Sequence, residues 1–286
     1  MSPASDPVRN DSFLTISIAD IKIRFEALNS RLLKSLKVHY GGFCISSAIS
    51  DVAIRLIERK ISVPKGSALL YKNRTWSVVK DSKYKWIIFS DNSVACCSHD
   101  WSRVDFFSEG PRQQLLFFLL PEILTISALP KFKGLMAHGC GVLDRTGKQG
   151  WAFLASSGGG KSTMAGLLKP YVRVLNDDRI ILRKTKDGVR MYGTPWHGEL
   201  SLTSSKSVLI RDIYFLQKAG IHSINSMSKL IFLKGLLKNT ALPKWDNNAY
   251  RITLRLLFFL AEYMCGKKLH FAKNSSVYGY IKRELT

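Results

Sequence analysis

Residues 154–163 read Leu-Ala-Ser-Ser-Gly-Gly-Gly-Lys-Ser-Thr, a glycine-rich segment that ends in Lys-Ser-Thr. An apolar run at 151–155 precedes the glycines, and residues 164–168 follow with helical character. A strand, a glycine-rich turn and a helix form the context that a phosphate-binding loop (P-loop, Walker A motif) requires. Glycines let backbone N–H groups converge on phosphate oxygens, and the start of a helix adds partial positive charge. The segment therefore predicts a site for nucleotide phosphates.

The predicted roles within this loop follow from side-chain chemistry. Lys161 can reach the outer phosphates, and the hydroxyl of Ser162 can ligate Mg²⁺. The pattern G-x-x-x-x-G-K-[ST] has glycine where this chain has Ala155, the smallest substitute. A glycine-rich loop that binds nothing is the alternative, but it does not explain Lys-Ser-Thr at a helix start. The expected nucleotide-binding residues are Ser156, Ser157, Gly158, Gly159, Gly160, Lys161, Ser162 and Thr163.

Two adjacent carboxylates follow the loop. Asp177 and Asp178 end an apolar segment, 16 and 17 residues after Lys161. An acid at the end of a strand, shortly after a phosphate loop, is well placed to hold Mg²⁺. Neighbouring side chains on an extended segment point to opposite sides, so one acid could serve the metal and the other could accept a hydroxyl proton. A solvated Asp-Asp turn is the alternative.

Two further stretches contain titratable side chains. His138 lies inside an apolar run beside Gly139, where it is either an ordinary core residue or a neighbour of the reacting groups. Residues 195–199 read Pro-Trp-His-Gly-Glu, in which His197 and Glu199 could bind substrate or metal. A β-turn with a packed tryptophan is the alternative there. The candidate Mg²⁺ ligands are thus Ser162, Asp178 and Glu199.

Taken together, these residues resemble the catalytic domain of the HPr kinase/phosphorylase family, and more closely its HPr-kinase-related members. The resemblance covers roughly residues 135–199 clearly and is plausible to the C-terminus. It is carried by four features: Ala137-His-Gly139, Ser157-Gly-Gly-Gly-Lys-Ser-Thr163, Leu175-Asn-Asp-Asp178 and Gly193-Thr-Pro-Trp-His-Gly-Glu199.

The resemblance implies a kinase that uses ATP and Mg²⁺ to phosphorylate a serine hydroxyl of a protein or peptide. It implies that Asp177 or Asp178 acts as metal ligand and base, and that His138 lies near the transferred phosphoryl group. It also implies a P-loop core related to that of phosphoenolpyruvate carboxykinases and, by analogy, a homo-oligomer. HPr kinases proper carry a glycine-rich signature where this chain has residues 195–199, so HPr, a biosynthetic peptide and a metabolite all stay open as acceptors. A regulator that binds a nucleotide without transfer is a further alternative.

The apolar patterning predicts an α/β (α+β) protein with two domains. Residues 1–130 are expected to form a small mixed domain, with a polar and disordered start at 1–12. Within it, residues 13–23 favour a strand, 25–38 a short helix, and 113–126 a buried helix bent at Pro121. Five short β segments are expected between the two helices, at 43–45, 68–71, 75–79, 86–89 and 94–97.

Residues 131–286 are expected to form the catalytic domain, after a linker at 129–134. Its predicted strands and helices flank the P-loop. Strands are expected at 135–143, 150–155, 172–175, 180–182, 189–192, 208–216 and 268–271, and helices at 164–168, 227–237, 249–264 and 275–285.

The charge balance is strongly basic: 43 Lys+Arg face 21 Asp+Glu, for a net charge of +22. Residues 201–286 alone contain 14 basic and 4 acidic residues. This excess favours an acidic partner, such as an acidic protein or an anionic membrane surface, although a solvated basic surface is as good a reading. Without a motif that reads bases, a specific nucleic-acid partner is not expected.

Five cysteines without a C-x-x-C spacing argue for reduced thiols and against a disulfide framework or a zinc site. The longest apolar stretch, 115–129, contains Pro121 and Glu122 and is shorter than a bilayer span. The sequence therefore predicts a cytoplasmic protein without a transmembrane segment.

Overall fold

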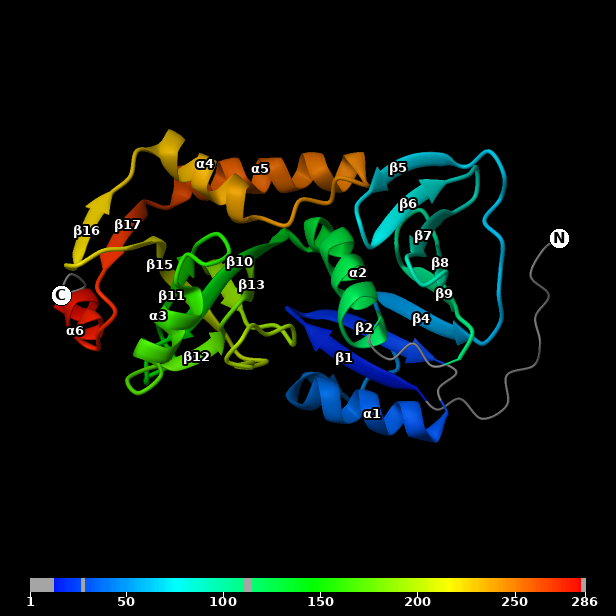
Figure 1. The fold of residues 1–286 in the computed structure, drawn as a ribbon, viewed down its shortest axis with the longest axis horizontal. Coiled ribbons are helices and arrows are strands. Elements are labelled where there is room, and N and C mark those ends of the chain that lie inside the picture. The colour runs from blue at the N-terminus through cyan, green and yellow to red at the C-terminus, as the bar shows by residue number, and fades with distance from the viewer. Residues whose placement is uncertain (1–12, 27–28, 111–114, 284–286) are drawn as a thin grey trace. The chain divides into compact units, whose positions relative to one another are not determined.

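The computed structural model describes residues 13–26, 29–110 and 115–283, so the expected disorder of residues 1–12 falls outside the described residues. The chain combines α-helices and β-strands, with two mixed sheets and, within the described ranges, six α-helices (Figure 1). This architecture is compatible with the α+β class. The chain divides into two compact units, Met1–Thr125 and Ile126–Thr286, each of which contains one of the sheets.

The first unit is built on a nine-stranded sheet in the order β3-β1-β2-β4-β9-β8-β7-β6-β5. Strands β2 and β4 pair in parallel, as do β4 and β9, and the other neighbours are antiparallel. The five expected β segments correspond to β3 and β5 to β8. The strands are β1 Leu14–Ile18, β2 Ile21–Glu26, β3 Cys44–Ile45, β4 Val52–Ile57, β5 Ala68–Lys72, β6 Trp76–Lys80, β7 Lys85–Phe89, β8 Val94–Cys97 and β9 Arg103–Phe107.

The start of the first unit differs from the expected strand and helix. Ala19 and Asp20 adopt positive φ angles of 50° and 63°, which turn the chain into a β1–β2 hairpin instead of one strand. Phe25 therefore belongs to β2, and the helix expected over 25–38 is wrong at its start. Helix α1 spans Ser30–Tyr40, because the side chain of Asn29 caps it by accepting from the amide of Leu32.

A continuous helical segment covers Leu115–Phe132. It comprises a π-helical turn, η2 Leu115–Leu119, then α2 Leu120–Ala128 and a 3₁₀ helix, η3 Leu129–Phe132. The π-helical turn directly precedes Pro121, and the helix continues through this proline; the expected helix start at 113–114 lies outside the described residues. Of the linker expected at 129–134, residues 129–132 are helical, with Leu129 and Pro130 buried, and Gly134 begins β10. At 18 residues, this segment is long and apolar enough for a membrane span, although the sequence predicted that the stretch 115–129 was too short for one. However, 61% of the segment is buried inside the protein. That burial is typical of a core helix, so the segment is only a weak indication of a span.

The second unit contains a sheet in the order β11-β10-β13-β14-β15-β17-β16, with β12 paired to β10. Because β11 also pairs with β15, strands β10, β11, β15, β14 and β13 close into a ring. The β11–β15 and β15–β17 pairs are parallel. The strands are β10 Gly134–Leu143, β11 Gly150–Leu154, β12 Arg173–Asn176, β13 Arg179–Thr185, β14 Gly188–Tyr192, β15 Ser207–Lys218, β16 Ser223–Ser226 and β17 Gly266–Phe271.

Strand β11 is buried on both faces, which explains its uninterrupted apolar sequence. Ala152 and Leu154 join a core cluster with helices α4 Lys229–Asn239 and α5 Asn247–Tyr263. Trp151 and Phe153 point to the opposite cluster, with helices α3 Lys161–Leu168 and α6 Ser276–Arg283. Alternation along a strand produces this division. The strand that leads into the glycine-rich loop is thus fixed from both sides.

Candidate functional site

The glycine-rich loop occupies residues 155–160, between the end of β11 at Leu154 and the start of α3 at Lys161 (Figure 1). Gly158 and Gly160 adopt φ angles of +74° and +101°, which side chains with a Cβ rarely tolerate. The first amides of a helix have no intrahelical acceptor, so those of α3 are available to an anion at this end. The local arrangement is therefore the strand, loop and helix that the sequence predicts.

Ala155, the departure from the glycine pattern, fits the loop because residue 159 is glycine. A Cβ placed on Gly159 would lie 2.6 Å from the Cβ of Ala155 and 2.9 Å from the carbonyl oxygen of Ser156. The amide of Gly159 also donates to that carbonyl at 3.0 Å. The methyl group of Ala155 therefore uses the space that Gly159 leaves open, and the loop keeps its tight turn.

Gly159→Ala should weaken binding of ATP by about tenfold or more, because the added methyl group forces the loop apart. Isothermal titration with ATP and Mg²⁺ measures this change. Gly166→Ala is the matched control, since a Cβ there would meet only the side chain of Leu200, at 3.8 Å. Equal ATP affinity in both variants would contradict a phosphate-binding role for the loop.

Lys161 folds back over its own loop. Its ammonium donates to the carbonyl oxygens of Ala155 at 3.2 Å and Ser156 at 3.3 Å, and the residue is buried. Burial lowers the pKa of Lys161, while the negative charge of Asp178 acts in the opposite direction. These two acceptors are neutral carbonyls, so an anionic phosphate could replace them at a gain in electrostatic energy.

The remaining loop residues are arranged around this lysine. Ser156, Ser157 and Gly158 are exposed, and Gly159 is half-buried. Ser162 and Thr163 are half-buried in the first turn of α3. Backbone and hydroxyl donors of the predicted phosphate site are thus accessible, while the lysine beneath them is shielded from water.

Asp178 contacts two neighbouring side chains, one through each carboxylate oxygen. Its Oδ1 lies 2.7 Å from Nε2 of His138, and its Oδ2 accepts from Arg179 at 3.0 Å. The hydrogen bond from His138, followed by the charge of Arg179, holds the pKa of Asp178 below its usual value against the opposing effect of burial. The backbone adds a further link, because the amide of Gly139 donates to the carbonyl of Asp178 at 2.8 Å. Asp178 is therefore ionised at neutral pH and held beside β10.

The two adjacent aspartates have different environments. Asp177 is fully buried, and its carboxylate accepts from the amides of Gly198 at 3.0 Å and Leu200 at 2.8 Å. The side chain of Asp178 keeps 22% of its surface exposed. Asp177 thus fixes the loop after β14, whereas only Asp178 of the pair is available to a ligand.

Asn176 organises this region, although the sequence pointed to it only within the segment 175–178 and gave it no role of its own. Its side-chain amide donates to Thr194 and to the carbonyl of Trp196, and its Oδ1 accepts from the amides of Asp178 and Arg179, both at 2.7 Å. The residue is fully buried. One side chain therefore joins the Asp178 turn to the segment 194–196.

Asn176→Ala should reduce the free energy of unfolding by about 3 kcal/mol, because it leaves several buried backbone groups without their partner. Urea denaturation followed by circular dichroism measures the change. Asn225→Ala, on the exposed part of β16, is the control and should be close to neutral. A similar small loss in both variants would contradict the structural role of Asn176.

The segment 195–199 is divided between core and surface. Trp196 is buried, whereas His197 and Glu199 are exposed. Nδ1 of His197 lies 2.9 Å from the carbonyl oxygen of Gly198. Burial lowers the pKa of Lys161, and the charge of Glu199 opposes this effect weakly, so this carboxylate is within electrostatic reach of the loop. The segment therefore brings the charge of Glu199 to bear on the predicted phosphate site.

No group of three or more His, Cys, Asp or Glu side chains that could hold a metal ion occurs in the described ranges. A Mg²⁺ ion bound to a nucleotide does not require such a group, because one or two protein oxygens and the phosphates suffice. Ser162 in the first turn of α3 and the partly exposed carboxylate of Asp178 match this chemistry. The residues present are thus compatible with Mg²⁺ carried in by a nucleotide.

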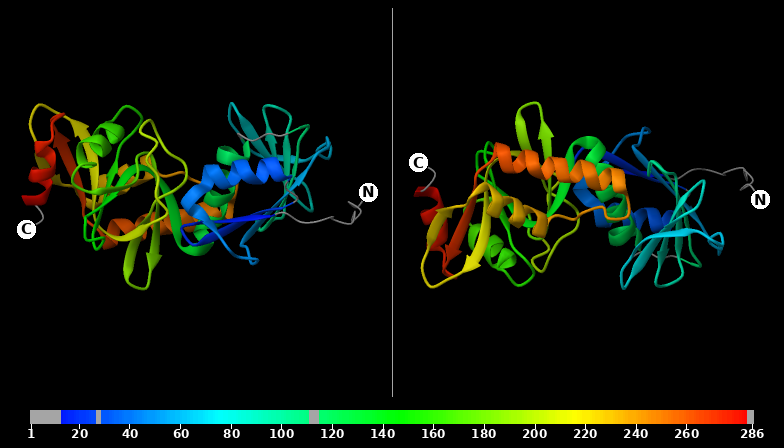
Figure 2. Two further views of the ribbon diagram at one scale, coloured as in Figure 1. Left: turned by 90° about the horizontal axis from the view of Figure 1, so that it is seen from below. Right: turned by 90° about the horizontal axis from the view of Figure 1, so that it is seen from above.

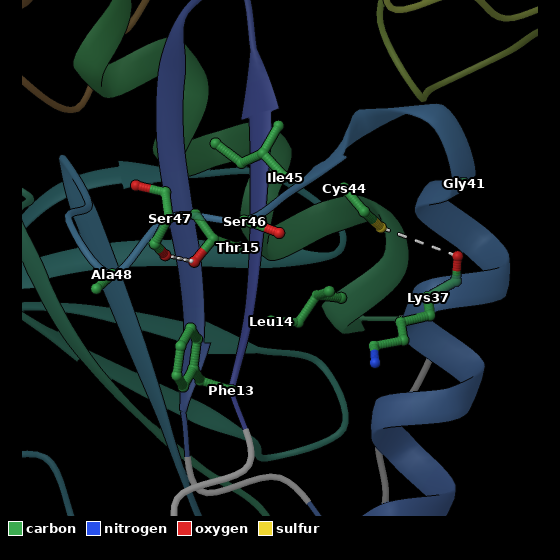
Figure 3. Close-up of a pocket in the computed structure, with 10 residues that line it drawn as sticks. All are labelled: Phe13, Leu14, Thr15, Lys37, Gly41, Cys44, Ile45, Ser46, Ser47 and Ala48. Atoms are coloured by element: carbon green, nitrogen blue, oxygen red, sulfur yellow. Dashed lines mark hydrogen bonds between the residues drawn. The ribbon is translucent and has the colours of Figure 1, made fainter.

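The first unit contains a cavity of about 670 Å³ beside β1, β3 and α1 (Figure 3). Among the described residues that line it, Lys37 and the thiol of Cys44 are titratable, and none is a carboxylate or a histidine. Burial raises the pKa of Cys44, so this thiol is a weak nucleophile. The cavity therefore lacks the groups that phosphoryl transfer needs. Its lining consists of Phe13, Leu14, Thr15, Lys37, Gly41, Cys44, Ile45, Ser46, Ser47 and Ala48.

All five cysteines are free thiols, in agreement with the expectation from their spacing. Cys140 lies in β10, two residues after His138, and burial raises its pKa well above the usual value. Cys140 is thus a packed core residue next to the site.

No protein-family model matches the chain, and no curated protein shows significant similarity to it. The resemblance to HPr kinase/phosphorylases stays a prediction from the four sequence features.

Proposed function

We propose that this protein is an ATP- and Mg²⁺-dependent kinase that transfers the γ-phosphoryl group to a serine hydroxyl of a protein or peptide. The observation that carries the proposal is the position of Asp178. Its ionised carboxylate is hydrogen-bonded to His138 at 2.7 Å, and its charge acts on Lys161 of the glycine-rich loop. A carboxylate beside a phosphate loop is the arrangement that phosphoryl transfer requires.

The proposed roles follow from the geometry of each residue. The amides of residues 158–160 and the ammonium of Lys161 hold the phosphates. Ser162 and Asp178 hold Mg²⁺, which neutralises phosphate charge when bound. Asp178 also orients the attacking hydroxyl and accepts its proton, while His138 positions the Asp178 carboxylate. The bond from the γ-phosphorus to the bridging oxygen breaks, the serine oxygen forms the new bond, and ADP leaves. We infer for this unit a P-loop kinase core of the HPr kinase and phosphoenolpyruvate carboxykinase type.

The acceptor class is tested by incubating the full chain with γ-labelled ATP, Mg²⁺ and a panel of acceptors. Peptides with serine at internal and terminal positions, the same peptides with alanine, free serine and sugars make up the panel. Label on serine peptides alone supports a peptide kinase. Label on sugars or free serine instead would overturn the peptide acceptor and favour a small-molecule kinase with the same site.

A nucleotide-binding regulator is the second candidate, favoured by one observation. Both carboxylate oxygens of Asp178 already have partners, His138 and Arg179. A carboxylate held in this way could stabilise the loop and play no part in orienting an acceptor hydroxyl. ATP binding without transfer to any acceptor, and without hydrolysis, would favour the regulator over the kinase.

A further inference from the structure

The outer surface of α4 and α5 combines basic and apolar side chains. We call it the α4–α5 face and define it by Ile231, Lys234 and Lys238 on α4 and Arg251, Arg255 and Phe258 on α5, all exposed. Each set has helical spacing, so it forms one stripe along its helix. Both helices bury their opposite sides, which include Phe232 and Leu257, in the same core cluster. The two exposed stripes therefore point the same way, away from the sheet.

The two helices lie side by side and antiparallel. Lys229 at the start of α4 forms an ion pair with Glu262 near the end of α5. Figures 1 and 2 show the shorter α4 beside one part of α5. At 1.5 Å per residue, the 17 residues of α5 extend for about 25 Å. The α4–α5 face is thus formed by two neighbouring helices, and not by a single exposed helix.

The charge of this surface is almost entirely positive. Residues 229–263 contain six basic and two acidic residues. Both acids are engaged locally: Asp246 caps α5 by accepting from the amide of Ala249 at 2.9 Å, and Glu262 pairs with Lys229. Lys234, Lys238, Arg251 and Arg255 therefore project positive charge that these acids do not neutralise.

Large apolar side chains lie among these charges. Ile231 is 56% exposed and Phe258 is 57% exposed. A headgroup layer accepts both kinds of side chain at once, because lysine and arginine meet lipid phosphates while aromatic and aliphatic groups enter the acyl boundary. We propose that the α4–α5 face binds an anionic lipid surface, a property that goes beyond the proposed phosphoryl transfer.

The test is sedimentation of the full chain with vesicles. Vesicles of phosphatidylcholine with phosphatidylglycerol should bind the protein, and vesicles of phosphatidylcholine alone should not. Each basic side chain near an anionic surface strengthens binding roughly fivefold. Arg251→Gln/Arg255→Gln should therefore weaken binding by about 25-fold. Phe258→Ser should weaken it without any change in charge.

The control is Lys148→Gln/Lys169→Gln, which removes the same net charge from two exposed positions elsewhere in the second unit. Its vesicle binding should match the wild type. An equal loss of vesicle binding in both double variants would show that binding depends only on the net charge of the protein, and it would overturn the proposal. Failure to bind anionic vesicles would overturn the proposal. Binding of soluble polyglutamate in preference to the vesicles would also overturn it, in favour of an acidic polypeptide partner. Circular dichroism confirms that each variant is folded.

Discussion

Asp178→Asn should lower the rate of phosphoryl transfer by about 10²-fold or more, while ATP still binds. Asparagine keeps the size of the side chain and can still meet His138 and Arg179, but it carries no charge and cannot accept the hydroxyl proton. Steady-state rates with a serine peptide give the first quantity, and isothermal titration with ATP gives the second. The rate should fall with little effect on the free energy of nucleotide binding.

Asp187→Asn provides the matched control for this experiment. Asp187 is exposed in the turn between β13 and β14, so the same chemical change there should leave the rate unaltered. Unchanged turnover in Asp178→Asn would show that this carboxylate takes no part in transfer. The regulator would then be the better explanation of the site.

Lys161→Met should abolish most activity without loss of stability. Methionine fills similar space but cannot neutralise phosphate charge, so transfer should fall by about 10²–10³-fold and ATP should bind more weakly. Burial already disfavours the charged form of Lys161, as its lowered pKa indicates. Removal of that charge should therefore leave the free energy of unfolding unchanged or slightly raised. Rates, ATP titration and urea denaturation measure the three quantities.

Lys169→Met tests the specificity of this result. Lys169 follows α3 and is exposed, so its replacement removes one charge from the same helix region without touching the loop. Transfer should stay within about twofold of the wild type, as expected for an exposed charge. Similar losses at positions 161 and 169 would mean that Lys161 acts only through the general positive field of the unit.

The core of the second unit could be predicted because its strands are buried on both faces. Strands β10 and β11 read as continuous apolar runs, and Asp144 to Gly147 read as the turn between them. Glycines mark the loop directly, since Gly158 and Gly160 occupy the left-handed region of φ. Local sequence was sufficient where burial or backbone conformation dictated the residue type.

Other elements depend on partners distant in the sequence. Strand β9 carries Asp105, whose carboxylate pairs with Arg55 of β4 at 2.9 Å, and neither strand was predicted. Strand β16 is only four residues long and has a single apolar residue, Ile224, so its sequence carries little strand signal, and its backbone pairs with β17. The hairpin at Ala19 lacks glycine, so its positive φ had no sequence signal. Pairing across the sheet, and not local propensity, determines these segments.

The site was predictable in its residue types but not in its division of roles. The sequence predicts Asp178 as a candidate metal ligand but leaves open which of Asp177 and Asp178 acts as the base. Their difference arises from Gly198 and Leu200, whose amides bind Asp177, and from His138, which binds Asp178. The role of Asn176 was not predicted for the same reason, because its acceptors lie about 20 residues further along the chain. Buried polar side chains acquire their roles from tertiary contacts, which no spacing rule reports.

Whether this site transfers phosphate is tested most directly by counting both products of one reaction. Full-length protein, ATP, Mg²⁺ and a serine peptide are mixed, and ADP and phosphoserine are quantified over time. A kinase of the proposed kind produces one phosphoserine for each ADP, and neither product accumulates with Asp178→Asn. ADP without phosphoserine, or no ADP despite saturating ATP and a complete panel of acceptors, would contradict phosphoryl transfer by this protein.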